Sequence, residues 1–558
     1  MHARRYLVSL IAFVALTACS HDHPVAPKVA CATSTSLSLT PLTGAVVALP
    51  SPCAQLSADA GRYFVAAQYA MQASTPQQTA FKVPTSAAAA SAFVGSGVTA
   101  GTPRVAGVPN ASELGTSMPN QIEFDSRLRD LERAIPLSQF ERRSGPKVSM
   151  AQRAMSAPDT LHDFSVLTTT SGGQFVTTRA RLRYAGQRVY VYEDTGSFNS
   201  FSDSAYAALG KLFDEVLYPI DTAAFGSPSD QDGNGHIIVL LSQLINKLTA
   251  AADCPTKGFV AGYFYGYDLT TGANSNRGEI FYSVSPDPTG KYSCAHSTSA
   301  VLALTPATFI HEFQHMISYN QHVLVRGGSS EVTWLNEGLS HIAEELGGKY
   351  YEAKYPAPLG RTNASQPFPD SAVAYVRPQI LNAYAYLQKS TTQSVTTFEG
   401  LGTLEERGAA WLFLRWLGDQ KGESIYRSLD QTSRTGIDNV ATAASESFPA
   451  LFGDFGIATY ADSINGVPRT SIPTRYRFTS RNTRQLFGYY FPIKPNPITT
   501  TAIACNSSAS GSMLQGTSSY FIVGGAAGCS SAQVSLTTST GTALAPSLAP
   551  QIAIFRLP

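Results

Sequence analysis

The feature that most restricts the fold of this chain is residues 311–315, which read His-Glu-Phe-Gln-His inside an apolar stretch. Thr305 and Pro306 lie just upstream, a pair typical of a helix N-terminus. On a helix, His311 and His315 are four positions apart and share one face. Two imidazoles on one face can bind one zinc ion, at about 2.0–2.1 Å each. The run therefore predicts a buried helix that carries two metal ligands.

Acidic side chains near this helix complete the chemistry that it predicts. Glu312 follows the first histidine and can reach a water held by a metal without binding the metal itself. Residues 334–339 read Trp-Leu-Asn-Glu-Gly-Leu, and apolar residues continue at helical spacing, so Glu337 is expected on a second helix. Its carboxylate would give a two-histidine, one-glutamate zinc site with a fourth position for water. Rival ligands, or partners of ligands, are His322, Glu331, His341 and Glu344.

Two sequence blocks carry a resemblance to a known family. They are His-Glu-Phe-Gln-His-Met-Ile at 311–317 and Trp-Leu-Asn-Glu-Gly-Leu-Ser at 334–340. These blocks resemble the gluzincin clan and, in detail, the hyicolysin-type neutral zinc metallopeptidases. The similarity spans about residues 160–465. It implies an α+β fold with a gluzincin-like catalytic domain, in which a mixed sheet is joined to a helical subdomain.

The resemblance also implies roles for individual residues. His311, His315 and Glu337 would bind one catalytic Zn²⁺, and Glu312 would be the general base that activates the zinc-bound water. Residues 279–282, Glu-Ile-Phe-Tyr, would form the sheet edge along which an extended peptide binds by strand addition. The expected activity is zinc-dependent hydrolysis of internal peptide bonds in a protein or peptide substrate.

This sequence departs from the family pattern at the expected oxyanion donor. Related gluzincins often carry a tyrosine three residues before the glycine of the helix that follows the metal site, and here that position is Glu405. Four other candidates remain open: Tyr384, Tyr386, Arg407 and His341. The Gly-x-Met-Glu-Asn block of the clan's aminopeptidases is absent, which favours internal cleavage. The alternatives are an aminopeptidase and a catalytically inactive surface-binding lipoprotein that keeps the peptidase scaffold.

The N-terminus indicates export. Residues 7–16 form an apolar stretch that is too short to span a bilayer and follows a basic pair. Residues 16–19, Leu-Thr-Ala-Cys, resemble the lipobox of bacterial lipoproteins. We therefore expect a signal peptide at 1–18, a lipid on Cys19 that binds the membrane, and a tether at 19–30. The expected location is the outer membrane or the cell surface.

Composition and cysteine count agree with an exported protein. Charged residues make up 14% of the chain, against about 25% in an average soluble protein. Forty basic residues meet 39 acidic ones, so no basic excess favours nucleic acid as a partner. Six cysteines remain besides Cys19, and an oxidising compartment permits disulfides between them. Pairing of sequence neighbours gives Cys31–Cys53, Cys254–Cys294 and Cys505–Cys529.

The texture of the sequence divides the chain into segments. In residues 31–83 short apolar runs alternate with turn residues, a pattern that predicts a small β-domain. Residues 84–159 predict a linker that contains an amphipathic helix at 122–135. The zinc metallopeptidase domain is expected at 160–470, and short strands with Ser, Thr and Gly turns predict a C-terminal β-sandwich at 475–558.

A second metal is indicated by residues 230–237, Asp-Gln-Asp-Gly-Asn-Gly-His-Ile. Asp230, Asp232 and Asn234 match the first half of a calcium-binding loop. The glutamate expected at the twelfth position is missing, because Leu241 stands there. The run therefore indicates either Ca²⁺ binding or a polar turn before a strand.

Overall fold

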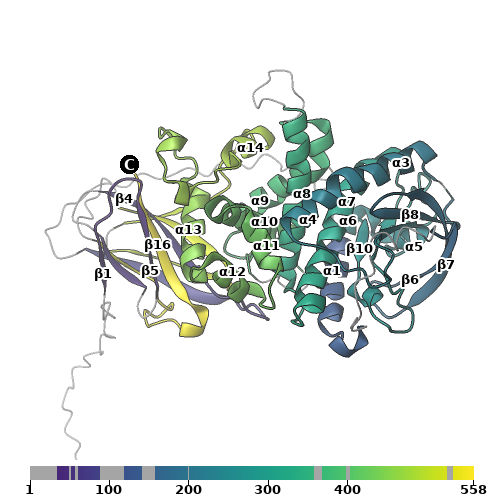
Figure 1. Ribbon diagram of the computed structural model, residues 1–558. Coiled ribbons are helices and arrows are strands. Elements are labelled where there is room, and N and C mark those ends of the chain that lie inside the picture. The colour runs from purple at the N-terminus through teal and green to yellow at the C-terminus, as the bar shows by residue number, and fades with distance from the viewer. Residues whose placement is uncertain are drawn as a thin grey trace, which may run out of the picture.

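The computed structural model describes residues 34–48, 52–56, 61–87, 119–140, 158–198, 200–356, 367–396, 402–504, 506–524 and 532–558. They form a β-sandwich at one end, a helical middle and a mixed sheet at the other end (Figure 1). The expected signal peptide, Cys19 and the tether lie outside the described residues. Among the described residues, no helix combines the length and the apolar character that crossing a bilayer requires.

The mixed sheet has six strands in the order β10-β11-β9-β8-β7-β6. Their bounds are β6 Leu161–Leu167, β7 Phe175–Ala185, β8 Val189–Asp194, β9 Ile237–Ser242, β10 Gly262–Phe264 and β11 Ile280–Val284. Strands β8, β9 and β11 are parallel, and the other pairs are antiparallel. Strand β9 is a continuous apolar run, as expected for a central strand covered on both faces.

Strand β11 corrects the expected position of the substrate edge. It lies between β10 and β9, so residues 279–282 do not form a free edge of the sheet. The edge strand on this side of the sheet is β10. Helix α7 (Thr298–Tyr319) packs against both β10 and β11.

Helices form the middle of the molecule and supply the residues of the candidate site. The longer ones are α1 Pro119–Arg133, α3 Asp203–Leu212, α8 Thr333–Lys354, α9 Asp370–Gln388, α10 Leu404–Lys421, α12 Gly436–Ala444 and α13 Phe448–Ala461. The shorter ones are α4 Tyr218–Ala224, α5 Gln243–Asn246, α6 Cys254–Lys257, α11 Ser424–Asp430 and α14 Thr483–Tyr490. Helices α7, α8, α9 and α10 pack on one another in sequence order.

Helix α7 begins earlier than its sequence indicated. Ser297 caps it by accepting a hydrogen bond from the Ala300 N–H, and Pro306 lies inside the helix. The Thr305 hydroxyl donates to the Val301 carbonyl (2.6 Å) and does not cap a helix end. Serine is as favourable an N-cap residue as threonine, and the helix begins after this serine rather than at Thr305.

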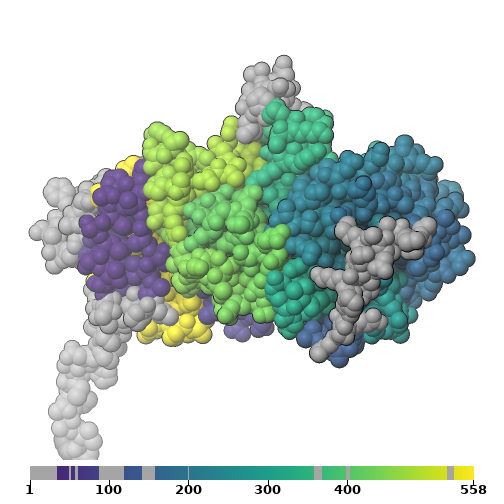
Figure 2. All heavy atoms as spheres, in the orientation of Figure 1, coloured from purple at the N-terminus to yellow at the C-terminus, as the bar shows by residue number. Residues whose placement is uncertain are grey.

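The two ends of the chain form one β-sandwich, which corrects the expectation of separate domains at 31–83 and 475–558. One sheet contains β1 Thr35–Leu37, β3 Cys53–Leu56, β15 Ala532–Ser535, β5 Thr79–Ala87 and β13 Ser508–Met513. The other contains β12 Thr501–Ile503, β14 Ser518–Gly524, β4 Arg62–Tyr69, β16 Pro550–Arg556 and β2 Gly44–Val47. Figure 2 shows the N-terminal and C-terminal segments side by side at this end. Each sheet draws strands from both termini, so neither segment has a core of its own.

One predicted disulfide lies within the described residues. Cys254 and Cys294 are bonded, with their Cα atoms 5.5 Å apart, and so confirm one of the three expected pairs. Cys53 is also disulfide-bonded. Its expected partner Cys31 lies outside the described residues, as do Cys505 and Cys529.

Candidate metal centre

Helices α7 and α8 bring the three predicted ligands to a common point. The Nε2 atoms of His311 and His315 are 3.1 Å apart. The Glu337 carboxylate lies 3.5 Å from His311 Nε2 and 3.6 Å from His315 Nε2. Bonds of about 2.0–2.1 Å in a tetrahedron place ligand atoms about 3.3 Å apart. The three side chains therefore fit one zinc-sized ion.

Charge and burial prepare these side chains to bind a cation. Glu337 is fully buried, and its Oε1 atom has no hydrogen-bond partner among the described residues. Burial acts to raise the pKa of Glu337, but Arg407 and the two histidines hold that pKa well below its usual range. Burial holds the pKa of His315 well below its usual range, so the ring is neutral, which is the form that binds metals.

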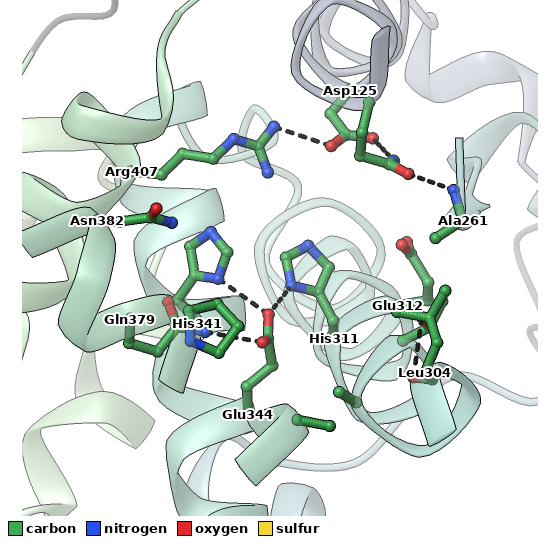
Figure 3. Close-up of a pocket in the computed structure, with 15 residues that line it drawn as sticks. Asp125, Ala261, Leu304, His311, Glu312, His341, Glu344, Gln379, Asn382 and Arg407 are labelled. Atoms are coloured by element: carbon green, nitrogen blue, oxygen red, sulfur yellow. Dashed lines mark hydrogen bonds and ion pairs between the residues drawn. The ribbon is translucent and has the colours of Figure 1, made fainter. Parts of the chain in front are cut away.

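The first ligand is oriented by a carboxylate behind it. Glu344 Oε1 lies 2.7 Å from His311 Nδ1 and 2.9 Å from His341 Nδ1, so it sits between the two rings (Figure 3). Gln379 donates to the other oxygen of Glu344 at 2.7 Å. Such a partner fixes the orientation of a ligating imidazole and raises its basicity. Both Glu344 oxygens are thus engaged, whereas Glu337 Oε1 has no hydrogen-bond partner among the described residues.

The second ligand has its own partner on α8. The Ser340 hydroxyl lies 3.0 Å from His315 Nδ1 and donates to Gln314 Oε1 at 2.6 Å. The remaining rivals, His322 and Glu331, lie elsewhere. They face each other across 3.9 Å in a separate buried cluster that also contains Asp430. The structure therefore places His341 and Glu344 beside the centre and excludes His322 and Glu331 from it.

Glu312 lies beside the ligands and is held by the edge strand. Its Oε2 atom accepts the backbone N–H of Phe264 in β10 at 2.7 Å. The side chain is buried, and burial raises its pKa to about 8. Glu312 also lines a pocket whose walls come from α1, α7, α8, α9 and α10 (Figure 3). A carboxylate beside a metal centre and facing a pocket can exchange a proton with a molecule bound there.

Helix α1, expected in a linker, forms one wall of this pocket. Asp125 on α1 accepts from Arg407 at 2.8 Å, and Arg407 also donates to Glu337 at 2.7 Å. Other α1 side chains bond the outward-facing backbone of β10 and its flanks. These bonds are Gln121 Nε2 to Gly262 O (3.1 Å), Ala261 N to Gln121 Oε1 (2.6 Å), Arg129 Nη2 to Phe264 O (2.7 Å) and Gly266 N to Glu132 Oε1 (2.7 Å). Sequence reasoning found this helix but missed its role, because its partners are distant in the chain.

The four candidate oxyanion donors separate clearly. Arg407 and His341 line the pocket, and Tyr384 and Tyr386 do not. Tyr384 instead donates to the Lys494 carbonyl at 2.8 Å, and Tyr386 is fully buried. The position expected to hold a tyrosine, Glu405, is ion-paired with Lys389.

Two imidazoles and a carboxylate lie around one point, with a second carboxylate and a pocket beside them, an arrangement compatible with a metal ion and similar to the centres of metal-dependent hydrolases. Over 170 residues the chain is 27% identical to the neutral metalloprotease ShpI of Staphylococcus hyicus. The match covers 30% of this chain and 36% of that protein, so the chain spans about a third of the relative's length. No family model matches the chain. The similarity supports a relationship to a metalloprotease.

Proposed function

We propose that this protein is a zinc-dependent endopeptidase. The observation that carries the proposal is the convergence of His311, His315 and Glu337 at zinc-like spacings, with Glu312 beside them. The partial similarity to a neutral metalloprotease supports the same reaction class. Nitrogen and carboxylate ligands in a buried site favour zinc over the oxygen-seeking cations.

The residues divide the work of hydrolysis between them. A zinc ion held by the three ligands would supply a Lewis acid that polarises the scissile carbonyl and makes water easier to deprotonate. Glu312 Oε2 is occupied by the Phe264 N–H, which leaves Oε1 to take a proton from the attacking water and pass it to the leaving nitrogen. Arg407 and His341 line the pocket and are the proposed stabilisers of the negative charge that develops on the carbonyl oxygen.

The proposed substrate is an extended peptide. The outward backbone groups of β10 lie next to Glu312 but are bonded to α1, so a peptide can pair with β10 only after α1 has moved. Hydrogen exchange with a bound peptide hydroxamate tests this condition. We expect faster exchange of α1 amides in the complex, and unchanged protection of α1 would mean that substrate does not use this edge.

The decisive experiment is a digest of an N-terminally blocked peptide library by the zinc-loaded protein. Glu312→Gln is expected to lower turnover by about 10²–10⁴-fold while zinc stays bound. Glu405→Gln, which removes an ion-paired carboxylate away from the pocket, is the matched control and should keep full activity. If the protein cleaves the same peptides only when their N-termini are left unblocked, it is an aminopeptidase. No cleavage by a folded, zinc-loaded protein would favour an inactive surface-binding protein.

We also propose that the protein is exported and anchored by a lipid on Cys19. The support is the lipobox-like run at 16–19 and the disulfide between Cys254 and Cys294. Cys19→Ala should move the protein from the membrane fraction to the soluble fraction. An unchanged distribution would contradict the anchor.

A further inference from the structure

A second group of carboxylates lies at the N-terminal ends of two central strands of the mixed sheet, β9 and β11. Asp230 and Asp232 precede β9, and Glu279 comes immediately before β11. One carboxylate oxygen from each of the three lies within 4.8 Å of the others. Because β9 and β11 are parallel neighbours, their N-terminal ends bring these residues to one place.

The loop at 230–236 is already folded as a calcium loop requires. Gly235, at its sixth position, has φ +71°, the left-handed conformation that the sharp turn of such loops needs. Asp230 accepts the Gly235 N–H at 2.9 Å, and Asp232 accepts the Asn234 N–H at 2.9 Å. These bonds turn the side chains at the first and third positions toward the inside of the loop.

Glu279 supplies the closing carboxylate that the loop itself lacks. It is 1% exposed, and the Ile238 N–H donates to its backbone carbonyl at 2.7 Å. Its Oε1 atom accepts the Gln231 N–H at 2.8 Å. The nearby Ser229 hydroxyl acts on the Glu279 pKa, but neither Ser229 Oγ nor Glu279 Oε2 has a partner in hydrogen-bonding geometry among the described residues. Glu279 is thus buried, and one of its carboxylate oxygens lies within 4.8 Å of a carboxylate oxygen of each aspartate.

The three neighbouring carboxylates favour the binding of a cation. Burial raises the pKa of Glu279 to about 7, and Asp232 and Asp230 act in the same direction. Three carboxylates at one point repel one another unless a cation or protons neutralise them. Asp232 is exposed and Asp230 is half-buried, so water can complete the coordination. An all-oxygen, partly hydrated site with irregular geometry suits calcium better than zinc or magnesium.

We propose that Asp230, Asp232 and Glu279 bind one Ca²⁺ ion, with Glu279 taking the part that the twelfth loop residue plays in a continuous calcium loop. The ion would fasten the 230–236 loop to the start of β11. It would thereby fix the ends of the two parallel strands at the centre of the mixed sheet. This site is independent of the proposed peptidase activity, since none of its residues lines the pocket.

Calcium binding is tested on the full chain, with zinc held saturating so that the histidine centre does not contribute. Titration of chelator-treated protein with CaCl₂ should show one binding event by calorimetry and a rise in Tm. Asp232 lies close enough to Tyr190 to raise the pKa of that phenol further, beyond the larger effect of burial. Tb³⁺ in place of calcium should therefore give luminescence on tyrosine excitation, and Tyr190→Phe should reduce that luminescence.

Variants decide whether these residues are the ligands. Glu279→Gln and Asp232→Asn should each weaken calcium binding by at least tenfold, whereas Glu215→Gln, an exposed control in the same domain, should not. Because Asp232 is exposed, Asp232→Asn keeps the test valid if Glu279→Gln fails to fold. No heat and no Tm change at millimolar calcium, equal binding by Asp232→Asn, or tighter binding of Mg²⁺ would each overturn the proposal.

Discussion

The histidine centre (His311, His315 and Glu337) and the acidic loop (Asp230 and Asp232, with Glu279 beside them) each bring ionisable side chains close together. The two groups differ in how those side chains are held. The histidine centre is buried, and each ligand is held by a partner behind it, as Glu344 holds His311 and Arg407 holds Glu337. The acidic loop is partly exposed and is held mainly by backbone amides. Burial and side-chain partners fix geometry and favour nitrogen-containing, zinc-type sites, whereas an exposed oxygen loop leaves room for water and favours calcium.

Substitution of Glu337 tests most directly whether buried charge holds the histidine centre, and it is expected to have a large effect on both stability and zinc affinity. Glu337→Gln leaves the buried Arg407 with Asp125 as its remaining carboxylate partner. Removal of one member of a buried ion pair typically lowers stability by about 3–5 kcal/mol. Zinc affinity should fall by more than about 100-fold, because loss of a mere outer partner already costs up to that amount. Denaturant unfolding of the metal-free protein and zinc competition with a chelator measure the two effects.

The control for Glu337 is Glu405→Gln, which removes one member of the Lys389–Glu405 pair, whose lysine is exposed. Exposed pairs contribute about 0–1 kcal/mol, so its stability should change little. Equal stability of the two variants would show that the histidine centre is not held by buried charge. Calcium binding should be unchanged in both, since the acidic loop shares no residue with either pair.

Local periodicity explains why the sequence revealed the histidine centre. His311 and His315 share a helix face by spacing alone, and Glu337 followed from a second apolar helical pattern. The structure brings these three residues together as that pattern predicts. A local pattern does not contain contacts between residues far apart in the sequence. Arg407, for example, donates a hydrogen bond to Asp125, which is 282 residues away.

The same limit explains the incorrect predictions. Strands β4 and β14 contain similar apolar runs, Tyr-Phe-Val and Tyr-Phe-Ile, and nothing in either run shows that the two strands pair with each other rather than within separate domains. The calcium-loop pattern is limited in the same way: Glu279 approaches the 230–236 loop from the start of a neighbouring strand, so the pattern, with Leu241 at its twelfth position, does not contain it. Sheet order decides both cases, and order depends on long-range pairing that no local window contains.

A smaller loss of zinc affinity is expected when Glu344 is substituted. This variant tests whether a ligand such as His311 needs a hydrogen-bonding partner behind it. Glu344→Gln keeps the shape of the side chain but removes the negative charge between His311 and His341. Zinc affinity should fall by about 10–100-fold, with the fold intact. Chelator competition measures the affinity, and circular dichroism checks the fold. An unchanged zinc affinity would mean that the ligands need no partner and would remove this difference from the acidic loop.

Asp430 shows a third way to accommodate a buried carboxylate, namely protonation. Burial raises its pKa from 3.8 to about 8, and the neighbouring Glu331 acts in the same direction. Between these pH values the native state holds a proton that the unfolded chain has lost. Stability should therefore fall as pH rises from about 4 to 8, by about 1.4 kcal/mol per pH unit from this group. Asp430→Asn lacks this contribution, so its stability should fall less than that of the parent between pH 6 and pH 8. Glu215→Gln, in an exposed position, should leave the slope unchanged. If Asp430→Asn also leaves it unchanged, Asp430 is ionised in the native state, and burial without a metal is not enough to protonate a carboxylate in this protein.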